Sequence, residues 1–265
     1  MLAGCGKAPR PGGEVIRPDC YPENLTIKPE SGKMTLMWDP NCDDSIMISG
    51  YNIYLRPKSI FERYGSAGLP RSIKPYNENP YPGDTDPDNE FETMIIEDAN
   101  NGEEYFVSVR TVFPDGSVSK SSNEVAVIPR PEGEFSLAFR YSDTTDGFSF
   151  KLGNYVRADG ELNDLYFFSK DGVDYIASPH RLNGFLRQTE FYSLGKTKDI
   201  YQYNHLELDI PAVEKMPIML GESYLARTAD GNYVMLRIED IRGQDRERIL
   251  RIKYIYQTIK DLMRF

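Results

Sequence analysis

The sequence lacks the features of a membrane-spanning or nucleic-acid-binding protein. It has no run of about 18 apolar residues, so no segment is expected to cross a bilayer as a helix. Positive charge is also scarce, because 31 Lys and Arg stand against 41 Asp and Glu and give a formal net charge of −10. Phosphate groups are bound through a positive field, so we expect no nucleic-acid partner and no binding of the folded body to anionic membranes.

Recognisable catalytic motifs are missing as well. The chain has no Gly-x-Ser-x-Gly motif, no His-Glu-x-x-His motif and no glycine-rich phosphate loop between a strand and a helix. Cys20 and Cys42 have no histidine near them in the sequence, which disfavours a thiol nucleophile. A carboxylate pair for glycoside hydrolysis stays open, because acids are too numerous for one pair to stand out. We therefore expect a non-enzymatic protein that needs no cofactor.

The chain does contain the alternation of apolar and polar residues that is typical of β-strands. Its 265 residues suffice for two ordinary domains, and the aromatic residues are mostly 18 Tyr and 13 Phe with a single Trp. Such residues suit the half-buried surface of a sheet. We predict a mainly β fold, in which one sandwich is followed by a second antiparallel β-rich domain.

Residues 20–130 form the first predicted domain. Inward-facing positions are expected at Leu25 and Ile27, at Met34, Leu36 and Trp38, at Tyr51, Ile53 and Leu55, and at Tyr105, Val107, Val109 and Thr111, with a closing strand at 121–127. These strands, in this order, resemble a fibronectin type III domain. The resemblance implies a β-sandwich, and it places Tyr105 at the tyrosine corner that ties a loop to the sandwich edge.

The chain departs from that family in residues 57–92, a connection far longer than is usual between strands. Either the middle strands of the family lie inside this long insertion, or the insertion is the working part of the domain. Its prolines, glycines and acids bury little apolar area, so we expect it to be mobile and to be the contact surface. We also expect deletion of residues 77–90 to leave the sandwich folded.

The second predicted domain spans residues 134–265 and follows a boundary marked by Pro129, Pro131 and Gly133. Strands are expected at 135–141, 148–152 and 248–256. Two hairpins are expected at 165–176 and 224–237, each with an Asp-Gly turn. A short helix is expected at 257–264. The strand and turn pattern is loosely similar to β-rich domains of bacterial surface lipoproteins, including haem-binding ones.

The first residues, Met1-Leu2-Ala3-Gly4-Cys5, resemble the end of a bacterial lipoprotein signal. The resemblance implies that residues 1–4 are removed and that Cys5 carries diacylglycerol. Residues 5–19 are rich in proline and glycine and predict a flexible, lipid-anchored tether. The implied location is the bacterial cell envelope, anchored to the membrane through lipid, and Lys7 in place of an aspartate is compatible with outer-membrane sorting.

Lipidation of Cys5 would leave Cys20 and Cys42 as an even pair. Disulfides are stable in an oxidising compartment outside the cytosol. In a type III sandwich, a residue just before Leu25 and one just after Trp38 lie at the same pole. We therefore predict a disulfide between Cys20 and Cys42.

Three weaker candidates for ligand binding are present. Asp84, Asp86, Asp88 and Glu90 alternate within the insertion and could present oxygens to calcium, although the EF-hand positions of glycine and the last glutamate are occupied by Asn89 and Ile95. The two histidines, His180 and His205, could ligate haem iron or another metal. Tyrosines in polar stretches, at Tyr64, Tyr76, Tyr81, Tyr201 and Tyr203, could stack on a glycan.

The function that these patterns favour is that of a non-enzymatic envelope lipoprotein, which binds or scaffolds another envelope or surface protein. One alternative is a lipoprotein that captures haem, a metal or a glycan with its second domain. A weaker alternative is a glycoside hydrolase with a carboxylate pair.

Overall fold

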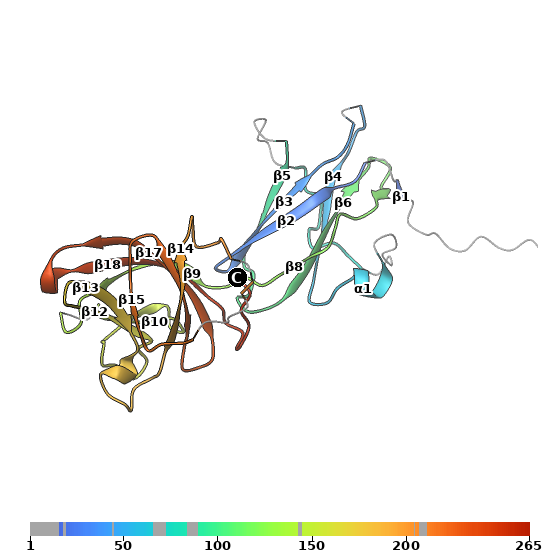
Figure 1. The fold of residues 1–265 in the computed structure, drawn as a ribbon. Helices are drawn as coiled ribbons and strands as arrows, with labels where there is room; N and C mark the ends of the chain where they lie inside the picture. Colours follow the sequence, from blue (N-terminus) through green and yellow to red (C-terminus); the bar gives the residue numbers. More distant parts are fainter. Residues whose placement is uncertain are drawn as a thin grey trace, which may run out of the picture. The chain divides into compact units, whose positions relative to one another are not determined.

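The computed structural model describes residues 16–17, 20–43, 45–65, 73–83, 90–142, 145–203, 205–206 and 211–265 (Figure 1). The chain forms two compact units, Met1–Pro129 and Arg130–Phe265. Their regular structure consists almost entirely of strands, which confirms the predicted mainly β fold.

The first domain contains two facing sheets. The three-stranded sheet has the order β2-β3-β5, with β2 at Glu23–Glu30, β3 at Lys33–Asp39 and β5 at Glu92–Ile96. The second sheet is built on β4 (Gly50–Arg56) and β6 (Tyr105–Val112), and β6 also pairs with β7 (Val118–Ser119) and β8 (Val125–Val127). A short β1 (Ile16–Arg17) pairs with β7 in parallel. This strand order is that of a fibronectin type III-like sandwich.

Alternating apolar residues of both sheets meet in one core. Met34, Leu36 and Trp38 of β3 are fully buried, as are Tyr51 and Ile53 of β4. The Trp38 ring meets Tyr51 edge to face, with ring centroids 5.2 Å apart. The predicted inward faces of these two strands are therefore confirmed.

Strand β6 is buried on both faces, whereas the sequence pattern predicted only one. Ser108 and Arg110, on the face turned away from the core, are as buried as Val107 and Val109. Part of the long insertion covers this side of the sheet: Ile60, Phe61 and Ile73 pack around Tyr54 of the neighbouring β4. Phe61 begins a one-turn helix, α1 (Phe61–Tyr64).

The insertion is fastened to the sandwich by specific bonds. The Glu124 carboxylate accepts the backbone N–H groups of Ile60 and Phe61, at 2.8 and 3.4 Å. Tyr51 and Tyr81 exchange two backbone hydrogen bonds, and the Tyr81 ring lies 6.2 Å from that of Trp38. Tyr81 thus pairs with the edge of β4 and packs on the core, so this part of the insertion belongs to the fold. The effect of deleting residues 77–90 stays a prediction.

The predicted role of Tyr105 is confirmed. Its hydroxyl accepts a hydrogen bond from the backbone N–H of Asn100, at 3.2 Å, and donates to the Glu103 carboxylate at 2.8 Å. A bond from a tyrosine near the start of this strand to the backbone just upstream defines a tyrosine corner.

The second domain contains two five-stranded sheets in which all pairs are antiparallel. One has the order β11-β10-β12-β13-β15, formed by Asn154–Val156, Gly147–Ser149, Leu165–Lys170, Val173–Ala177 and Lys215–Pro217. The other has the order β14-β16-β17-β18-β9, formed by Glu190–Lys196, Glu222–Arg227, Tyr233–Arg242, Ile249–Tyr256 and Glu132–Ala138. Isolated bridges connect the two sheets, between Phe139 and Phe167 and between Phe191 and Val213.

The interior between these sheets is filled by a large, aromatic-rich cluster. Phe135 and Phe148 stack with their centroids 3.9 Å apart, and Phe150 and Tyr254 pack against them. Aromatic rings bury more apolar area per residue than aliphatic side chains, so this cluster gives the second domain its main stabilising core.

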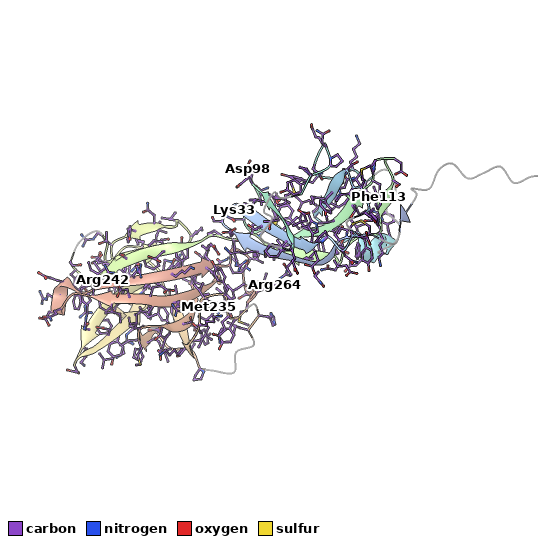
Figure 2. The ribbon with its side chains drawn as sticks, turned by 90° about the horizontal axis from the view of Figure 1, so that it is seen from above. Lys33, Asp98, Phe113, Met235, Arg242 and Arg264 are labelled. Carbon is purple, nitrogen blue, oxygen red and sulfur yellow. A yellow bond between two sulfur atoms is a disulfide. The ribbon has the colours of Figure 1, made fainter. Side chains whose placement is uncertain are left out.

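Both predicted hairpins are present. Asp171 and Gly172 have positive φ values of 53° and 78°, as a tight hairpin turn requires. The second hairpin joins β16 to β17 around Asp230-Gly231. Figure 2 shows Arg242, at the end of β17, and Arg264 at opposite ends of the domain. We call these the hairpin end, with the Asp171-Gly172 turn and Arg242, and the loop end, with Gly231 and Arg264.

The prediction of a helix at 257–264 is wrong. Residues 257–265 instead fold back along the sheet: Gln257 and Asp261 donate backbone hydrogen bonds to Tyr233 and Gly231. Phe265 is buried on the outer face of the sheet, in a cluster with Leu225, Tyr233, Met235 and Ile255. Burial of this apolar face outweighs the local helical preference of so short a segment.

Candidate binding surface

The loop that joins β13 to β14, residues 178–189, lies at the loop end of the second domain. Buried polar bonds fix both ends of this loop. Ser178 donates its N–H to the Glu214 carbonyl at 2.8 Å, and its hydroxyl accepts the N–H of Thr189 at 2.9 Å. Ser178 and Thr189 are both fully buried. A 3₁₀ turn, η1 (Pro179–Arg181), continues the loop from Ser178.

The tip of the loop presents a phenylalanine to solvent. The Asn183 side chain accepts the N–H of Phe185 at 3.1 Å, and the Asn183 carbonyl accepts the N–H of Leu186 at 2.9 Å. This turn holds the Phe185 side chain outward, where the residue is 99% exposed. A large apolar side chain in water gains much from any surface that covers it.

Arg187 ties the loop to the body of the domain. Its guanidinium donates to Asp164 at 2.9 and 3.1 Å and to Asp230, in the β16–β17 turn, at 2.8 Å. The second Asp164 oxygen accepts the N–H of Phe150 at 2.9 Å. The arginine therefore joins three segments that are distant in the sequence.

The two carboxylates in this cluster respond differently to their surroundings. Burial raises the pKa of Asp164, although the Arg187 charge opposes the shift. Hydrogen bonding to Arg187 lowers the pKa of Asp230, which lies nearer to solvent. Burial also raises the pKa of Tyr256 to about 12, and the neighbouring Asp164 and Asp230 add to the shift.

A second polar group fixes the start of the loop. His180 Nδ1 lies 3.3 Å from Glu214 Oε1, and Gln188 donates its side-chain amide to the same carboxylate at 2.8 Å. Beside Gln188, a pocket of about 230 Å³ opens between the loop and the β16–β17 turn, lined by Gln188, Glu190, Arg227, Thr228, Ala229 and Gly231. The loop end thus combines a fixed polar rim with one exposed aromatic ring.

The carboxylates bound to Arg187 are not available to a substrate. Arg187 bridges Asp164 and Asp230, and the Asp164 side chain is only 1% exposed. Substrate cannot reach a carboxylate that is covered in this way. The Asp164–Arg187–Asp230 cluster is a structural ion network that holds the loop.

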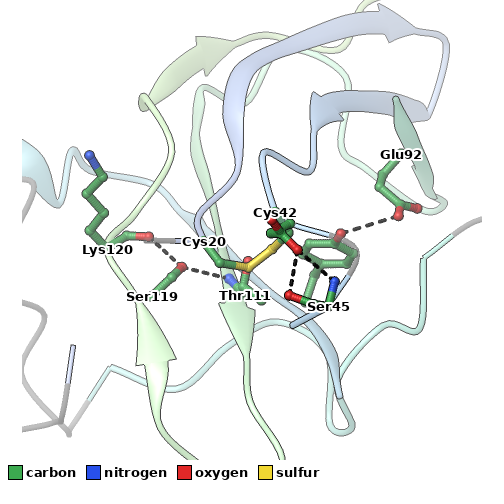
Figure 3. Close-up of a disulfide and its surroundings, with 9 residues drawn as sticks. Cys20, Cys42, Ser45, Glu92, Thr111, Ser119 and Lys120 are labelled. Carbon is green, nitrogen blue, oxygen red and sulfur yellow. Dashed lines mark hydrogen bonds between the residues drawn. A yellow bond between two sulfur atoms is a disulfide. The ribbon is translucent and has the colours of Figure 1, made fainter. Parts of the chain in front are cut away.

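The predicted disulfide is present in the structure. Cys20, just before β2, is bonded to Cys42, just after β3, with their Cα atoms 4.5 Å apart (Figure 3). In Figure 3 the bond lies beside Thr111 and Ser119, where the Ser119 hydroxyl accepts the Thr111 N–H at 2.9 Å. The bond closes the pole of the sandwich where the first strand begins.

Several predicted site residues lie outside the described part of the chain. These are Cys5 and the acidic residues Asp84, Asp86 and Asp88, so the predictions of lipidation and of calcium binding stay predictions. Glu90 is described and is exposed. Among the described residues, no helix is long and apolar enough to cross a membrane.

The two histidines make separate contacts. His180 pairs with Glu214, whereas His205 is exposed and forms an isolated backbone bridge with Arg264. Within the described ranges, no group of three or more His, Cys, Asp or Glu side chains could hold a metal ion. The haem or metal role of His180 and His205 stays a prediction.

The tyrosines proposed for glycan stacking divide into two groups. Tyr64 and Tyr76 are 40% and 47% exposed and could contact a ligand. Tyr81 packs on the core of the first domain, and Tyr201 and Tyr203 pack on the outer-face cluster of the second. These three tyrosines are partly buried and pack against their own domains.

Sequence reasoning missed Phe185, Arg187, Asp164 and Asp230. The Asn183-Gly184 pair is a turn signal and could have located the tip of the loop. Nothing in the sequence marks the ion network, because Arg187 lies 23 and 43 residues from its two partners.

No protein-family model matches the chain, and no curated protein matches it. Among solved structures, the chain is similar to the "Twitchin kinase region from C.elegans (Fn31-NL-kin-CRD-Ig26)", at 13% sequence identity and a TM-score of 0.29. The similarity covers 91% of this chain and 39% of that one, so the chain spans well under half the length of that structure. A likeness at this level says nothing about activity, and the type III-like assignment rests on the strand order of the first domain.

Proposed function

We propose that this protein is a non-enzymatic binding module of the bacterial cell envelope, anchored by lipid at Cys5, which contacts a protein partner through the 178–189 loop. The observation that carries the proposal is Phe185, which is 99% exposed at the tip of a loop held by buried bonds.

The physical argument concerns the cost of binding. A flexible loop loses conformational entropy when a partner orders it, whereas a loop that is already fixed loses little. Aromatic anchors that enter a pocket of the partner supply much of the energy in protein interfaces. The 178–189 loop has both properties, because its ends are tied by Ser178 and Arg187 and its tip carries Phe185.

The charge of the loop indicates which partner it suits. Arg181 is exposed and forms no ion pair with any residue that the structure describes, and the loop itself contains no acidic residue. A partner with an apolar pocket and an acidic rim would complement both Phe185 and Arg181.

The envelope location is supported by two features of the first domain and its tether. The residues before Cys5 match the end of a lipoprotein signal, and the Cys20–Cys42 disulfide suits an oxidising compartment. Radiolabelled palmitate supplied to a bacterium that expresses the precursor should label the wild type and not Cys5→Ser. Equal labelling of both would exclude Cys5 as the lipid anchor.

The protein contact is tested with a photo-reactive phenylalanine analogue. Placed at Phe185 in the full chain, it should cross-link a defined envelope protein on illumination, and the Phe185→Ala variant should compete poorly for that protein. The matched control site is Ile249, which is 45% exposed and pairs with Arg242 at the hairpin end of the domain. The proposal fails if both sites give the same adducts or if neither gives one.

A further inference from the structure

A second pocket lies at the hairpin end of the second domain, away from the 178–189 loop. Its volume is about 320 Å³. The lining residues come from the end of β9, the β12–β13 turn and the β17–β18 turn: Phe139, Ser169, Lys170, Asp171, Gly172, Asp245, Arg246 and Arg248. Pockets of this size lie at the lower end of the range that holds small molecules.

Three cationic side chains surround the pocket. Lys170 and Arg246 are exposed, and neither forms an ion pair with another residue in the described ranges. Arg248 is held by Asp174, with Nη1 2.9 Å from Oδ1. Its Nε is buried and has no hydrogen-bond partner among the described residues. Protein atoms cover this Nε, but the Arg248 side chain as a whole is 30% exposed and lines the pocket, so its positive charge lies close to any ligand there.

Hydrogen-bond acceptors and an aromatic ring complete the lining. Asp171 and Asp245 are exposed at turn positions with positive φ values, and neither has an ion-pair partner among the residues described. Phe139 is half-buried and packs edge to face on Phe167, with ring centroids 5.7 Å apart. One small site therefore offers donors with positive charge, carboxylate acceptors and a fixed apolar surface.

We propose that this pocket binds an acidic sugar, a ring that carries a carboxylate together with free hydroxyl groups. The carboxylate would accept hydrogen bonds from the exposed Lys170 and Arg246 side chains, beside the positive charge of Arg248. Sugar hydroxyls donate to Asp171 and Asp245, and the apolar face of the ring contacts Phe139. This site is independent of the Phe185 contact and would add an acidic glycan to the ligands of the protein.

A compact inorganic anion explains the pocket less well. Phosphate would use the cations, but it would meet the charges of Asp171 and Asp245, which repel it. A sugar acid places its negative charge at one side of the ring and its hydroxyl donors at the others, so it uses both kinds of charged group.

The test is titration calorimetry of the full chain with an oligosaccharide of alternating glucuronate and N-acetylglucosamine. An N-acetylglucosamine oligomer of equal length tests whether the carboxylate is needed, and inorganic phosphate tests for a general anion site. The variants are Lys170→Gln and Arg246→Gln, whose side chains are exposed and contribute little to folding. Arg242→Gln is the control, because Arg242 is exposed on the same hairpin but does not line the pocket.

The proposal predicts binding of the glucuronate oligomer alone. Each pocket variant should weaken binding by roughly two- to fivefold, as expected for one exposed charged hydrogen bond, and Arg242→Gln should leave it unchanged. Absence of binding, equal binding of the neutral oligomer or of phosphate, or equal loss in Arg242→Gln would each overturn the proposal.

Discussion

Both domains are β-sandwiches, but the interactions that stabilise each one internally are different. The first has a modest core around Trp38 and adds a disulfide, a tyrosine corner and side chains that bond to strand backbones. The second has a larger core of stacked aromatic rings and a buried ion network around Arg187. A smaller core buries less apolar area per residue, so single bonds such as the disulfide contribute a larger share of the domain's free energy of unfolding.

The largest expected effect is in the second domain. Arg187→Met should lower its free energy of unfolding by about 3–5 kcal/mol, because Asp164 would be left as an uncompensated buried charge. Calorimetry of the full chain should show a shift in the transition of the second domain alone. Arg242→Met is the matched control: Arg242 pairs with Asp240 at the surface and should cost less than about 1 kcal/mol. Equal losses in the two variants would show that the network is not structural.

The pH dependence of that loss follows from Asp230. Arg187 lowers the Asp230 pKa below its ordinary value of 3.8, so this carboxylate stabilises the folded state above that pH. The contribution is lost as the pH falls through the folded-state pKa. Asp164, whose pKa is raised, becomes protonated on acidification. It is then neutral, so loss of Arg187 no longer leaves an uncompensated buried charge. The difference in melting temperature between wild type and Arg187→Met should therefore be large at pH 7 and should narrow at pH 3.

The next largest effect belongs to the first domain. Replacing Cys20 and Cys42 with alanine should lower its free energy of unfolding by roughly 3 kcal/mol, because the disulfide constrains the unfolded chain across a separation of 22 residues. Denaturant unfolding of wild type and variant, with and without reductant, measures the loss. Reductant should affect only the wild type. A shift in the second domain's transition would contradict the separation of the two units.

A smaller effect is expected when Asn123 is replaced. Its side-chain amide forms hydrogen bonds with the backbone of β2, in the way that a neighbouring strand would. Its amide accepts the Leu25 N–H at 2.8 Å and donates to the Leu25 carbonyl at 2.9 Å. Asn123→Ala should cost about 1–3 kcal/mol, since both backbone groups lose their partner. Hydrogen exchange at the Leu25 amide should accelerate. Asn123→Asp keeps an acceptor for the Leu25 N–H and should therefore keep that amide protected from exchange. Identical exchange rates in the two variants would exclude a role for the Asn123 side chain as this acceptor.

The smallest expected effect is at the tyrosine corner. Tyr105→Phe removes the bonds to the Asn100 N–H and to the Glu103 carboxylate and should cost about 1 kcal/mol. Tyr64→Phe is the control, because Tyr64 is 40% exposed and its hydroxyl has no hydrogen-bond partner among the described residues. Denaturant midpoints of the first domain compare the two. No difference between them would show that the corner adds nothing to stability.

The sequence predicted the features that depend on residues close together in the chain. Alternation placed Trp38 and Ile53 in the core, and the Asp171-Gly172 pair located a hairpin, because both signals depend on neighbouring residues only. The pairing of Cys20 with Cys42 followed from the topology that the type III resemblance implied. Contacts between distant segments gave no such signal: the packing of Tyr81 on Trp38 and the binding of Arg187 to Asp230 depend on tertiary structure.

The 178–189 loop separates the residues that hold it in place from the residues that it exposes to water. Ser178, Arg187 and Thr189 bear the structural bonds, while Arg181 and Phe185 are exposed to water. Substitutions at the tip therefore cost little stability, because surface positions without such bonds change it by only about 0.5 kcal/mol. Under the proposed function, a change of binding specificity would need only a few substitutions at the tip, while the bonds that hold the loop stay the same.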